Sequence, residues 1–291
     1  MRGQQIMSIL IIAGSDSIAG AGMQADLKTA AAFGVYAATA VTALTAQNTM
    51  SFTMSQPASA EMMRAQLDAI ISDIDIAAVK IGMLPDAATT EVVADFLEEH
   101  NSLPVVLDPV RVTSTGAELG DEGALEVLND RILSRSRIVT PNLFEARVLA
   151  QVAEGEDVTS EEMAQCIFSR GARAVLIKGG HANAADDADP SLSVDRLFLS
   201  DGRSMEFESA RREGEFHGTG CTLSTAIACG ISQGKSLGQA VARAHNYLAV
   251  CIAQAEQLGH GSYILKHMSE ESIRVARHTS SKNRRRFVER P

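Results

Sequence analysis

The sequence predicts a single three-layer α/β domain in which helices cover both faces of a mostly parallel central sheet. Short apolar segments of strand length alternate with segments of helical periodicity, an order typical of βαβ units. The strand segments are continuously apolar, which indicates strands that are covered on both faces. A chain of 291 residues, of which 45% are hydrophobic, is long enough to bury such a core.

The predicted strands and helices alternate over the first two thirds of the chain. The strands cover residues 9–13, 35–44, 77–81, 105–107, 138–140 and 174–177. The helices cover residues 21–33, 60–72, 87–100, 122–133, 144–151 and 160–170. Residues 50–56 alternate with a period of two and predict a small outlying strand pair or flap. Ligands are expected at the carboxyl ends of the parallel strands.

The last third of the chain departs from this alternation. A polar loop over residues 181–190 precedes a hairpin, whose strands cover 195–199 and 204–207 on either side of an Asp-Gly turn. Two long helices that are poor in charge follow, over residues 218–233 and 237–258.

The two ends of the chain are expected to lie outside the domain, which covers residues 8–268. Residues 1–7 read as a leader or a disordered N-terminus, and the short apolar run that follows predicts a buried strand rather than a signal peptide. Residues 269–291 form a basic tail. A solvated terminus is the simpler interpretation of this tail, and weak contact with an anionic partner is the other.

Composition and charge exclude several functions. The formal net charge of −10 repels nucleic-acid backbones, and the low aromatic content of 4% disfavours base stacking. No apolar stretch approaches the roughly 20 residues of a membrane helix. The four cysteines form no C-x-x-C pair, which indicates reduced thiols in a cytoplasmic protein. We therefore expect neither a nucleic-acid nor a membrane partner.

The segment EGEFHGTGCTLS, residues 213–224, predicts an anion site. Gly218, Thr219 and Gly220 open a helix, so their N–H groups lack intrahelical acceptors and lie at the positive end of the dipole. Cys221 in the first turn is expected to have a depressed thiol pKa and to accept a proton from an attacking hydroxyl. The alternative is a small-residue helix start with Cys221 packed in the core, and this segment alone does not decide between them.

Polar residues follow several other predicted strands. Asp108 directly follows one strand, and Asn142 and Glu145, three residues apart, follow another. Such oxygen ligands suit Mg²⁺, although each acid taken singly is more often a helix cap. Lys178 stands beside two glycines at a strand end, as a phosphate or nucleotide contact would. The glycine-containing loop after the first strand, residues 14–22, lets backbone approach a ligand, but its spacing fits neither a P-loop nor a dinucleotide fingerprint.

Seven segments together resemble one family. AGSDS, TALTAQNT, VKIGML, LDPV, TPNLFEA, LIKGGH and HGTGCTLS occur in this order, and the chain is similar over residues 8–261 to the hydroxymethylpyrimidine/phosphomethylpyrimidine kinases of thiamine biosynthesis. The resemblance implies a ribokinase-like fold, and ATP-dependent phosphorylation of hydroxymethylpyrimidine and then of its monophosphate, with Mg²⁺. It also implies a homodimer.

The resemblance assigns roles to individual residues. Gln47 would hold the pyrimidine edge, and an amide suits this role because it both donates and accepts. The residues that would line the same pocket are Gly14, Asp26, Met83 and Val110. Asp108, Asn142 and Glu145 would organise Mg²⁺ and phosphate, and Lys178 and Thr219 would contact the nucleotide. Gly218–Gly220 would form the anion hole and Cys221 would be the base.

The chain departs from the family pattern at two places. Ile18 and Ala19 stand where the family has a glycine-rich stretch, which restricts that loop and bears on the second phosphorylation. Arg111 and residues 114–116 replace a Met and a Lys-Ser-Gly segment.

Three other functions are considered. A pyridoxal or pyridoxine kinase of vitamin B6 salvage is the nearest, although Gln47 and Met83 favour the pyrimidine. A non-catalytic pyrimidine-binding regulator would not need Cys221 and Glu145. A sugar or nucleoside kinase is disfavoured by Cys221, since those enzymes resemble one another through an Asp there.

Overall fold

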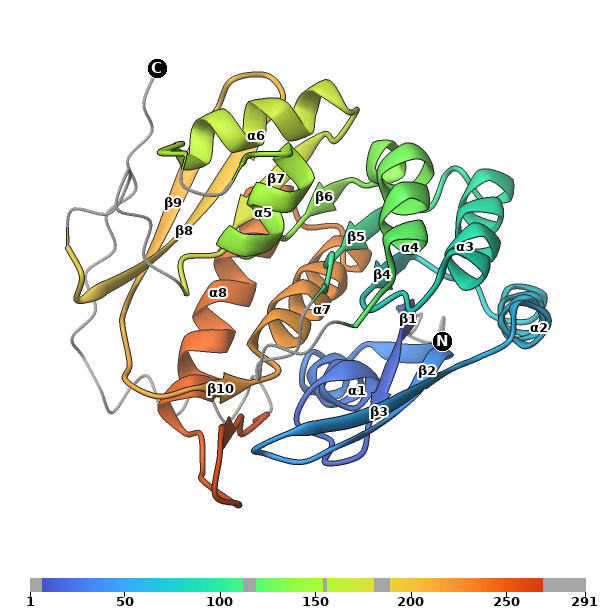
Figure 1. Ribbon diagram of the computed structural model, residues 1–291, viewed down its shortest axis with the longest axis horizontal. Coiled ribbons are helices and arrows are strands. Elements are labelled where there is room, and N and C mark those ends of the chain that lie inside the picture. The colour runs from blue at the N-terminus through green and yellow to red at the C-terminus, as the bar shows by residue number, and fades with distance from the viewer. Residues whose placement is uncertain (1–6, 112–118, 154–155, 181–188, 269–291) are drawn as a thin grey trace, which may run out of the picture.

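A nine-stranded sheet forms the centre of the described molecule, in the order β3-β2-β1-β4-β5-β6-β7-β8-β9 (Figure 1). The computed structural model describes residues 7–111, 119–153, 156–180 and 189–268. The strands are β1 (Ser8–Asp16), β2 (Tyr36–Gln47), β3 (Phe52–Pro57), β4 (Ala78–Ile81), β5 (Val105–Leu107), β6 (Ile138–Val139), β7 (Ala174–Ile177), β8 (Leu192–Leu199) and β9 (Ser204–Ala210). The six strands from β2 to β7 in this order are parallel, and β3, β8 and β9 join antiparallel at the two edges.

Helices cover both faces of the sheet, as the continuous apolar strands predicted. One layer contains α1 (Gly22–Ala32), α7 (Thr219–Ser232) and α8 (Leu237–Ala253). The other contains α2 (Ala60–Ile71), α3 (Ala87–Glu99), α4 (Glu122–Val127), α5 (Leu143–Ala150) and α6 (Ser160–Ser169). Among the described residues, none of these helices is long and apolar enough to cross a membrane.

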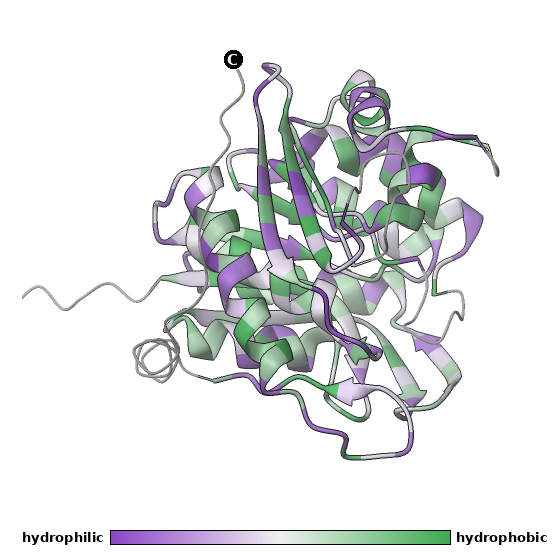
Figure 2. Ribbon diagram, turned by 90° about the vertical axis from the view of Figure 1, so that its left-hand side faces the viewer, coloured by the Kyte–Doolittle hydropathy of each residue, from purple (hydrophilic) through white to green (hydrophobic). Residues whose placement is uncertain are grey.

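Alternation along each strand divides the core into two. In β1, Ile9 and Ile11 pack with the α1–α7–α8 layer, whereas Leu10 and Ile12 pack with the other layer. All four are 0% exposed, and each contributes about 1.5–3 kcal/mol when it is buried. In Figure 2 the edge strands β8 and β9, which face the viewer, mix purple and green residues, because one face of this hairpin is exposed.

Side-chain caps explain where most helices begin. Ser59, Asp86, Asp121, Thr159 and Ser236 each accept a hydrogen bond from the backbone N–H three residues on, which satisfies one of the free donors of the first turn. The helix α7 differs: its N-cap is Gly218, which has no side chain to use in this way.

Two predicted helices end differently in the structure. The helix predicted over 122–133 is α-helical only to Val127 and continues as a π-helical segment, Leu128–Ile132, and a 3₁₀ turn, Leu133–Arg135. The wider π turn lets Leu128 and Leu133 both face the core. The helix predicted to reach residue 258 ends at Ala253, because the backbone of Glu256 pairs with Ile264 instead.

The chain after α8 returns to the start of α7. Here β11 (Tyr263–Ile264) pairs in parallel with β10 (Phe216–His217), directly before Gly218. The predicted flap over residues 50–56 is the edge strand β3, paired antiparallel with β2. The predicted leader, the basic tail and most of the polar loop over 181–190 lie outside the described residues.

Candidate active site

One large cavity opens at the carboxyl ends of the parallel strands. Its volume is about 760 Å³, which is typical of small-molecule sites. Every predicted site residue except Asp26 borders it: Gly14, Gln47, Met83, Asp108, Val110, Asn142, Glu145, Lys178, Gly218, Thr219, Gly220 and Cys221. The structure therefore brings twelve of the thirteen predicted residues together around one cavity at this edge of the sheet.

The amino terminus of α7 borders the middle of this cavity. Gly218 has a left-handed φ of 83°, and a Cβ atom there would lie 2.0 Å from the carbonyl oxygen of Gly20. Only glycine allows the two loops to approach this closely. The first turn contains no acidic residue, so its N–H groups and the helix dipole leave a site that suits an anion.

Small residues let α7 lie deep in the molecule. Every residue from Thr222 to Ser232 is buried, and a Cβ atom on Gly230 would lie 2.8 Å from Cβ of Ala240 in α8. The helix is thereby packed closely between the sheet and α8.

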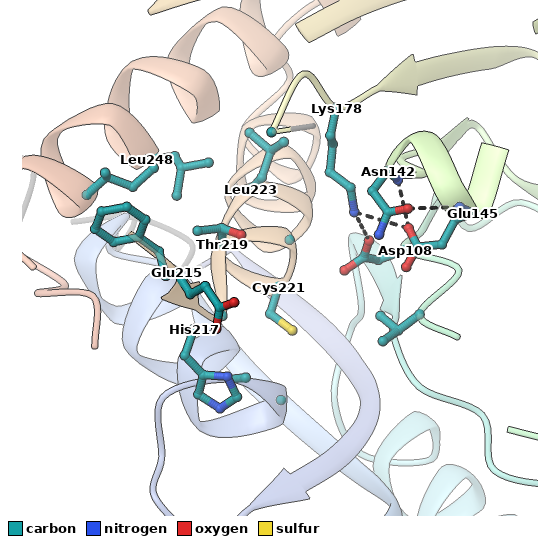
Figure 3. Close-up of a pocket in the computed structure, with 18 of the residues that line it drawn as sticks. Asp108, Asn142, Glu145, Lys178, Glu215, His217, Thr219, Cys221, Leu223 and Leu248 are labelled. Atoms are coloured by element: carbon teal, nitrogen blue, oxygen red, sulfur yellow. Dashed lines mark hydrogen bonds and ion pairs between the residues drawn. The ribbon is translucent and has the colours of Figure 1, made fainter. Parts of the chain in front are cut away.

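The thiol of Cys221 lies in the first turn of α7 beside this anion site (Figure 3). The predicted depression of its pKa is wrong. The pKa of the thiol is raised to about 12: burial is the main cause, the carboxylates of Asp26 and Asp108 add to it, and Lys80 partly offsets it. The position at a helix terminus is insufficient here because the thiolate loses its hydration.

A buried cluster of charges follows β5 and β7 (Figure 3). The Nζ atom of Lys178 lies 2.8 Å from Oδ1 of Asp108 and 3.5 Å from Oε2 of Glu145. Burial opposes the charged form of Lys178, but the two carboxylates outweigh it and raise the lysine pKa. Burial also raises the pKa of Glu145, with repulsion from Asp108 adding to the rise. Two carboxylates therefore share a single cation.

Asn142 and Glu145 form the capping box that begins α5. The side chain of Asn142 accepts from the Glu145 N–H at 2.8 Å, and the Glu145 carboxylate accepts from the Asn142 N–H at 2.7 Å. The capping role that the sequence left open is thus present, and it orients Glu145 towards Lys178. Within the described ranges, no three or more Asp, Glu, His or Cys side chains gather around a metal-sized space.

The opposite end of the cavity is formed by β1, β2 and β4. Gln47 is held at its backbone by Ser17, whose Oγ accepts from the Gln47 N–H at 2.9 Å, and its side-chain amide donates to Oγ1 of Thr45 at 3.1 Å. A Cβ atom on Gly14 would lie 3.1 Å from the sulfur of Met83, so Gly14 leaves room for this side chain. Val110 borders the same end and is half-buried.

Asp26 does not border the cavity, contrary to the prediction. Its carboxylate is 0% exposed, lies 2.7 Å from Nζ of Lys80, and accepts from Oγ1 of Thr225 at 2.7 Å. Lys80 is the partner that borders the cavity. The prediction differs from the structure because Asp26 turns inward, from α1 towards β4 and α7.

Asp16 and His217 were not singled out in the sequence, although both border the cavity. The Asp16 carboxylate accepts from the N–H groups of Ile18, Gly20 and Ala21, and lies 3.0 Å from Nε2 of His217. Burial opposes its ionisation, but the bond to His217 and these amides outweigh it and lower the pKa of Asp16. An Asp at a strand end before a small-residue loop was the available signal.

The loop that Asp16 organises contains a strained residue. Ala19 has a φ of 57°, a left-handed conformation that costs a residue with a Cβ atom about 1–2 kcal/mol. This is one of the two positions where the chain departs from the family pattern. At the other, Nη1 of Arg111 donates to the carbonyl of Asp121 at 3.3 Å, and residues 114–116 lie outside the described residues.

The third part of the cavity lies between the hairpin β8–β9 and α8. Its helical side is apolar and includes Leu223, Leu248 and Ile252, whereas its hairpin side includes the polar Ser193 and Asp195. Asp195 accepts from the Gly179 N–H at 2.8 Å and lies 2.9 Å from Nδ1 of His245. Asp195 thus fixes the backbone next to Lys178. These residues come from elements with no recognisable motif, so no pattern in the sequence indicated them.

Comparisons with known proteins show the family to which the chain belongs. The family described as "Phosphomethylpyrimidine kinase" matches residues 16–266. A hydroxymethylpyrimidine/phosphomethylpyrimidine kinase from Rhizobium meliloti is 42% identical over 250 residues, which cover 86% of this chain and 91% of that protein. The kinase of the same name from Haemophilus influenzae is 38% identical over 257 residues, which cover 88% and 94%.

Solved structures show the same fold. A Staphylococcus aureus pyridoxal kinase in complex with pyridoxal has a TM-score of 0.82 at 30% identity, and the match covers 93% of this chain and 96% of that one. A phosphomethylpyrimidine kinase from Clostridium difficile has a TM-score of 0.70 at 31% identity, and the match covers 84% and 99%. The predicted ribokinase-like fold is thereby confirmed, and the chain belongs to the phosphomethylpyrimidine kinase family.

Proposed function

We propose that this protein transfers the γ-phosphoryl group of ATP to hydroxymethylpyrimidine, and then a second one to the resulting monophosphate. The observation that carries this proposal is the position of the α7 amino terminus. It borders the cavity between Gln47 and Met83 on one side and the Lys178 cluster on the other.

The order of the strands supports this division of the cavity. Gln47 ends β2 and Met83 follows β4. Asp108 follows β5, Lys178 follows β7, and Asp195 lies within β8. The pyrimidine would occupy the β2–β4 end. The adenine and ribose would occupy the apolar end between β8–β9 and α8, and the transferred phosphoryl group would lie at the start of α7, near β5.

The chemistry follows from this placement. The substrate hydroxyl oxygen bonds to the γ-phosphorus as the bond from that phosphorus to the β–γ bridging oxygen breaks. The N–H groups of Gly218–Gly220 are directed to the equatorial oxygens. The thiol of Cys221 first gives its own proton to solvent water, and the resulting thiolate then accepts the hydroxyl proton of the substrate.

Asp108, Asn142 and Glu145 would hold Mg²⁺ in this proposal. Two buried carboxylates that share Lys178 leave excess negative charge, and oxygen ligands completed by water and phosphates suit this ion. When bound, Mg²⁺ would neutralise charge on the triphosphate. Removal of Mg²⁺ with excess EDTA should abolish turnover, and readdition should restore it.

The test is ATP consumption by the purified protein with Mg²⁺, with hydroxymethylpyrimidine, its monophosphate and pyridoxal supplied in parallel. Turnover of both pyrimidines is expected, and turnover of neither would contradict the proposal. Pyridoxal kinase is the second candidate, favoured by the TM-score of 0.82 to the pyridoxal-bound enzyme. Turnover of pyridoxal alone would assign that function instead.

The second phosphorylation has its own test at Ala19. The strained loop that contains it borders the pyrimidine end at Asp16 and Ala21. Wild-type protein is expected to convert the monophosphate, and Ala19→Gly should leave the first step unchanged. If wild type does not phosphorylate the monophosphate but Ala19→Gly does, Ala19 restricts the loop.

We further propose a cytoplasmic homodimer. Leu44 and Met54, each 59% exposed, lie on neighbouring strands at the β2–β3 edge, and Met50 beside them is 61% exposed. Burial of this apolar edge against a second copy would remove it from water. Sedimentation analysis should show a dimer for wild type and a monomer for Leu44→Lys/Met54→Lys. All four cysteines are free, including the exposed Cys166, in keeping with a reducing compartment.

A further inference from the structure

A second buried lysine lies beneath the amino terminus of α7, and the proposed phosphoryl transfer leaves it without a role. Lys80 is in the middle of β4, where a hydrophobic side chain would be expected, and both it and its partner Asp26 are 0% exposed. A buried ion pair stabilises a fold no better than well-packed apolar residues of similar volume. Its presence at this position therefore calls for a function.

The position of Lys80 follows from strand alternation. Val79 and Ile81 pack with the α2–α6 layer, whereas Ala78 packs with the α1–α7–α8 layer. Side chains alternate along a strand, so Lys80 shares the face of Ala78 and is directed towards α1 and α7. It borders the same cavity as Cys221.

The ammonium is held in place by groups that belong to α1 and α7. Asp26 Oδ2 lies 2.7 Å from Nζ of Lys80, while Asp26 Oδ1 accepts from Thr225 at 2.7 Å. Thr225 stands four residues after Cys221, one turn along α7. A Cβ atom on Gly82 would lie 2.9 Å from Nζ of Lys80, so the glycine leaves space for the ammonium.

Without Lys80, the charged side chains around Cys221 would disfavour a negative charge on its sulfur. Asp26 from α1 and Asp108 from the end of β5 both disfavour the thiolate, and Lys80 from β4 favours it. Lys178 from the end of β7 also interacts with the thiolate, but it is shared by Asp108 and Glu145. Lys80 is therefore the cation that most favours the thiolate form of Cys221.

We propose that Lys80 is a positioning residue for this kinase: its ammonium, fixed by Asp26 and Thr225, stabilises negative charge on Cys221 and at the start of α7. The proton acceptor of the reaction then depends on a cation that does not itself touch the substrate. This inference rests on the proposed function for its role in turnover, but its electrostatic part can be measured without any substrate.

The experiment is alkylation of the full chain by iodoacetamide over a range of pH, with the modification at each cysteine followed by peptide mass spectrometry. The double variant Lys80→Gln/Asp26→Asn removes both charges and retains a polar pair. We expect its alkylation rate at Cys221 to fall about tenfold or more, which corresponds to about one unit of thiol pKa. Cys166 is exposed on α6 and serves as the internal reference whose rate should not change.

The single variant Asp26→Asn gives the opposite sign. It removes the carboxylate and retains the ammonium, so alkylation of Cys221 should become faster than in wild type. A merely structural ion pair would not produce opposite changes in these two variants. If the pH profile of Cys221 alkylation in both variants matches that of wild type, the proposal is overturned. If only one of the two variants folds, an alkylation rate at Cys221 equal to that of wild type in that variant overturns it.

Turnover separates this inference from the proposed function. With a substrate that wild type phosphorylates, the double variant should have a lower kcat and little change in KM, and its kcat should recover as the pH is raised. If wild type phosphorylates none of the three substrates while the alkylation rates change as expected, the proposed function fails and the electrostatic role of Lys80 stands.

Discussion

The two buried lysines of the cavity have different surroundings. Lys80 is paired with one carboxylate, and both side chains are 0% exposed. Lys178 faces two carboxylates, and its side chain is 14% exposed. The first pair is neutral and closed to solvent, whereas the second cluster carries excess negative charge at the cavity surface. The difference is that Lys80 acts only on groups of the protein, whereas Lys178 is also partly exposed to the cavity, where we propose that phosphate and Mg²⁺ bind.

Loss of one partner should be most damaging at the closed pair. We expect Lys80→Met to lower the free energy of unfolding by about 3–5 kcal/mol, because it leaves the buried Asp26 carboxylate without a cation. Urea denaturation measures this. The double variant Lys80→Gln/Asp26→Asn should recover most of the loss, and equal destabilisation in both variants would show that packing, rather than charge, is responsible.

Lys178 should matter more for turnover than for stability. We expect Lys178→Met to lower kcat about 10²–10³-fold, the loss typical when a preorganised electrostatic contact to the transition state is removed. Steady-state kinetics with ATP varied measure it. Lys235→Met, at an exposed lysine between α7 and α8, is the matched control and should behave as wild type. A kcat within a few fold of wild type for Lys178→Met would remove the distinction between the two lysines.

Cys221 lies within reach of both charge systems, and its substitution tests which role it has. We expect Cys221→Ala to lower kcat about 10²-fold through loss of the proton acceptor, with little change in substrate binding. Cys166→Ala is the control, because that thiol is exposed on α6. A decrease smaller than about tenfold would indicate that Cys221 shapes the anion hole without accepting the proton, which a largely dissociative transition state permits.

A third buried pair, Asp195 with His245, extends the comparison to a cation that titrates near neutral pH. Burial opposes the charged form of His245, but the bond to Asp195 outweighs it and raises the pKa above the usual 6.5. A raised pKa stabilises the fold fully below pH 6.5, and this contribution is lost as the pH rises through the folded-state pKa.

The expected effect is the smallest of the four. The free energy of unfolding of wild type, measured by urea denaturation, should decrease between pH 6.5 and 8 by an amount on the order of 1 kcal/mol or less. His245→Gln should flatten that part of the pH profile. The double variant Lys80→Gln/Asp26→Asn should keep the slope of wild type, since Lys80 stays charged throughout this range in wild type and its removal takes away no titration there. A wild-type slope retained in His245→Gln would assign the dependence to another group.

Sequence and structure agree most closely where the signal is local. The apolar runs of β1, β5 and β7 are continuous and lie at the predicted places, because a strand covered on both faces is apolar along its length. The strand β4 also lies at its predicted place, although Lys80 interrupts its apolar run. The small-residue motif at Gly218–Cys221 predicted a helix start bordering the site, which the structure contains. The end of α8 at Ala253 could not be predicted, since pairing between Glu256 and Ile264 depends on the returning chain.

The environments of charged groups were predicted less well. Cys221 was expected to have a low pKa from its helix position alone, but burial and two carboxylates from other elements decide its value. Asp26 was expected in the substrate pocket, and it pairs instead with a lysine 54 residues away. Asp16 and His217, which are 201 residues apart, form a pair that no local pattern indicates.

The fold class, the residues of the parallel strands and the glycine-rich helix start could be predicted from the sequence alone, because each depends on periodicity or on backbone freedom within a few residues. Which charges meet depends on the tertiary structure. It placed Lys80 with Asp26, Lys178 with Asp108 and Glu145, and Cys221 near all of them. The physical reason is that burial and pairing depend on distance through space, and side-chain charge acts over that distance whatever the separation along the chain.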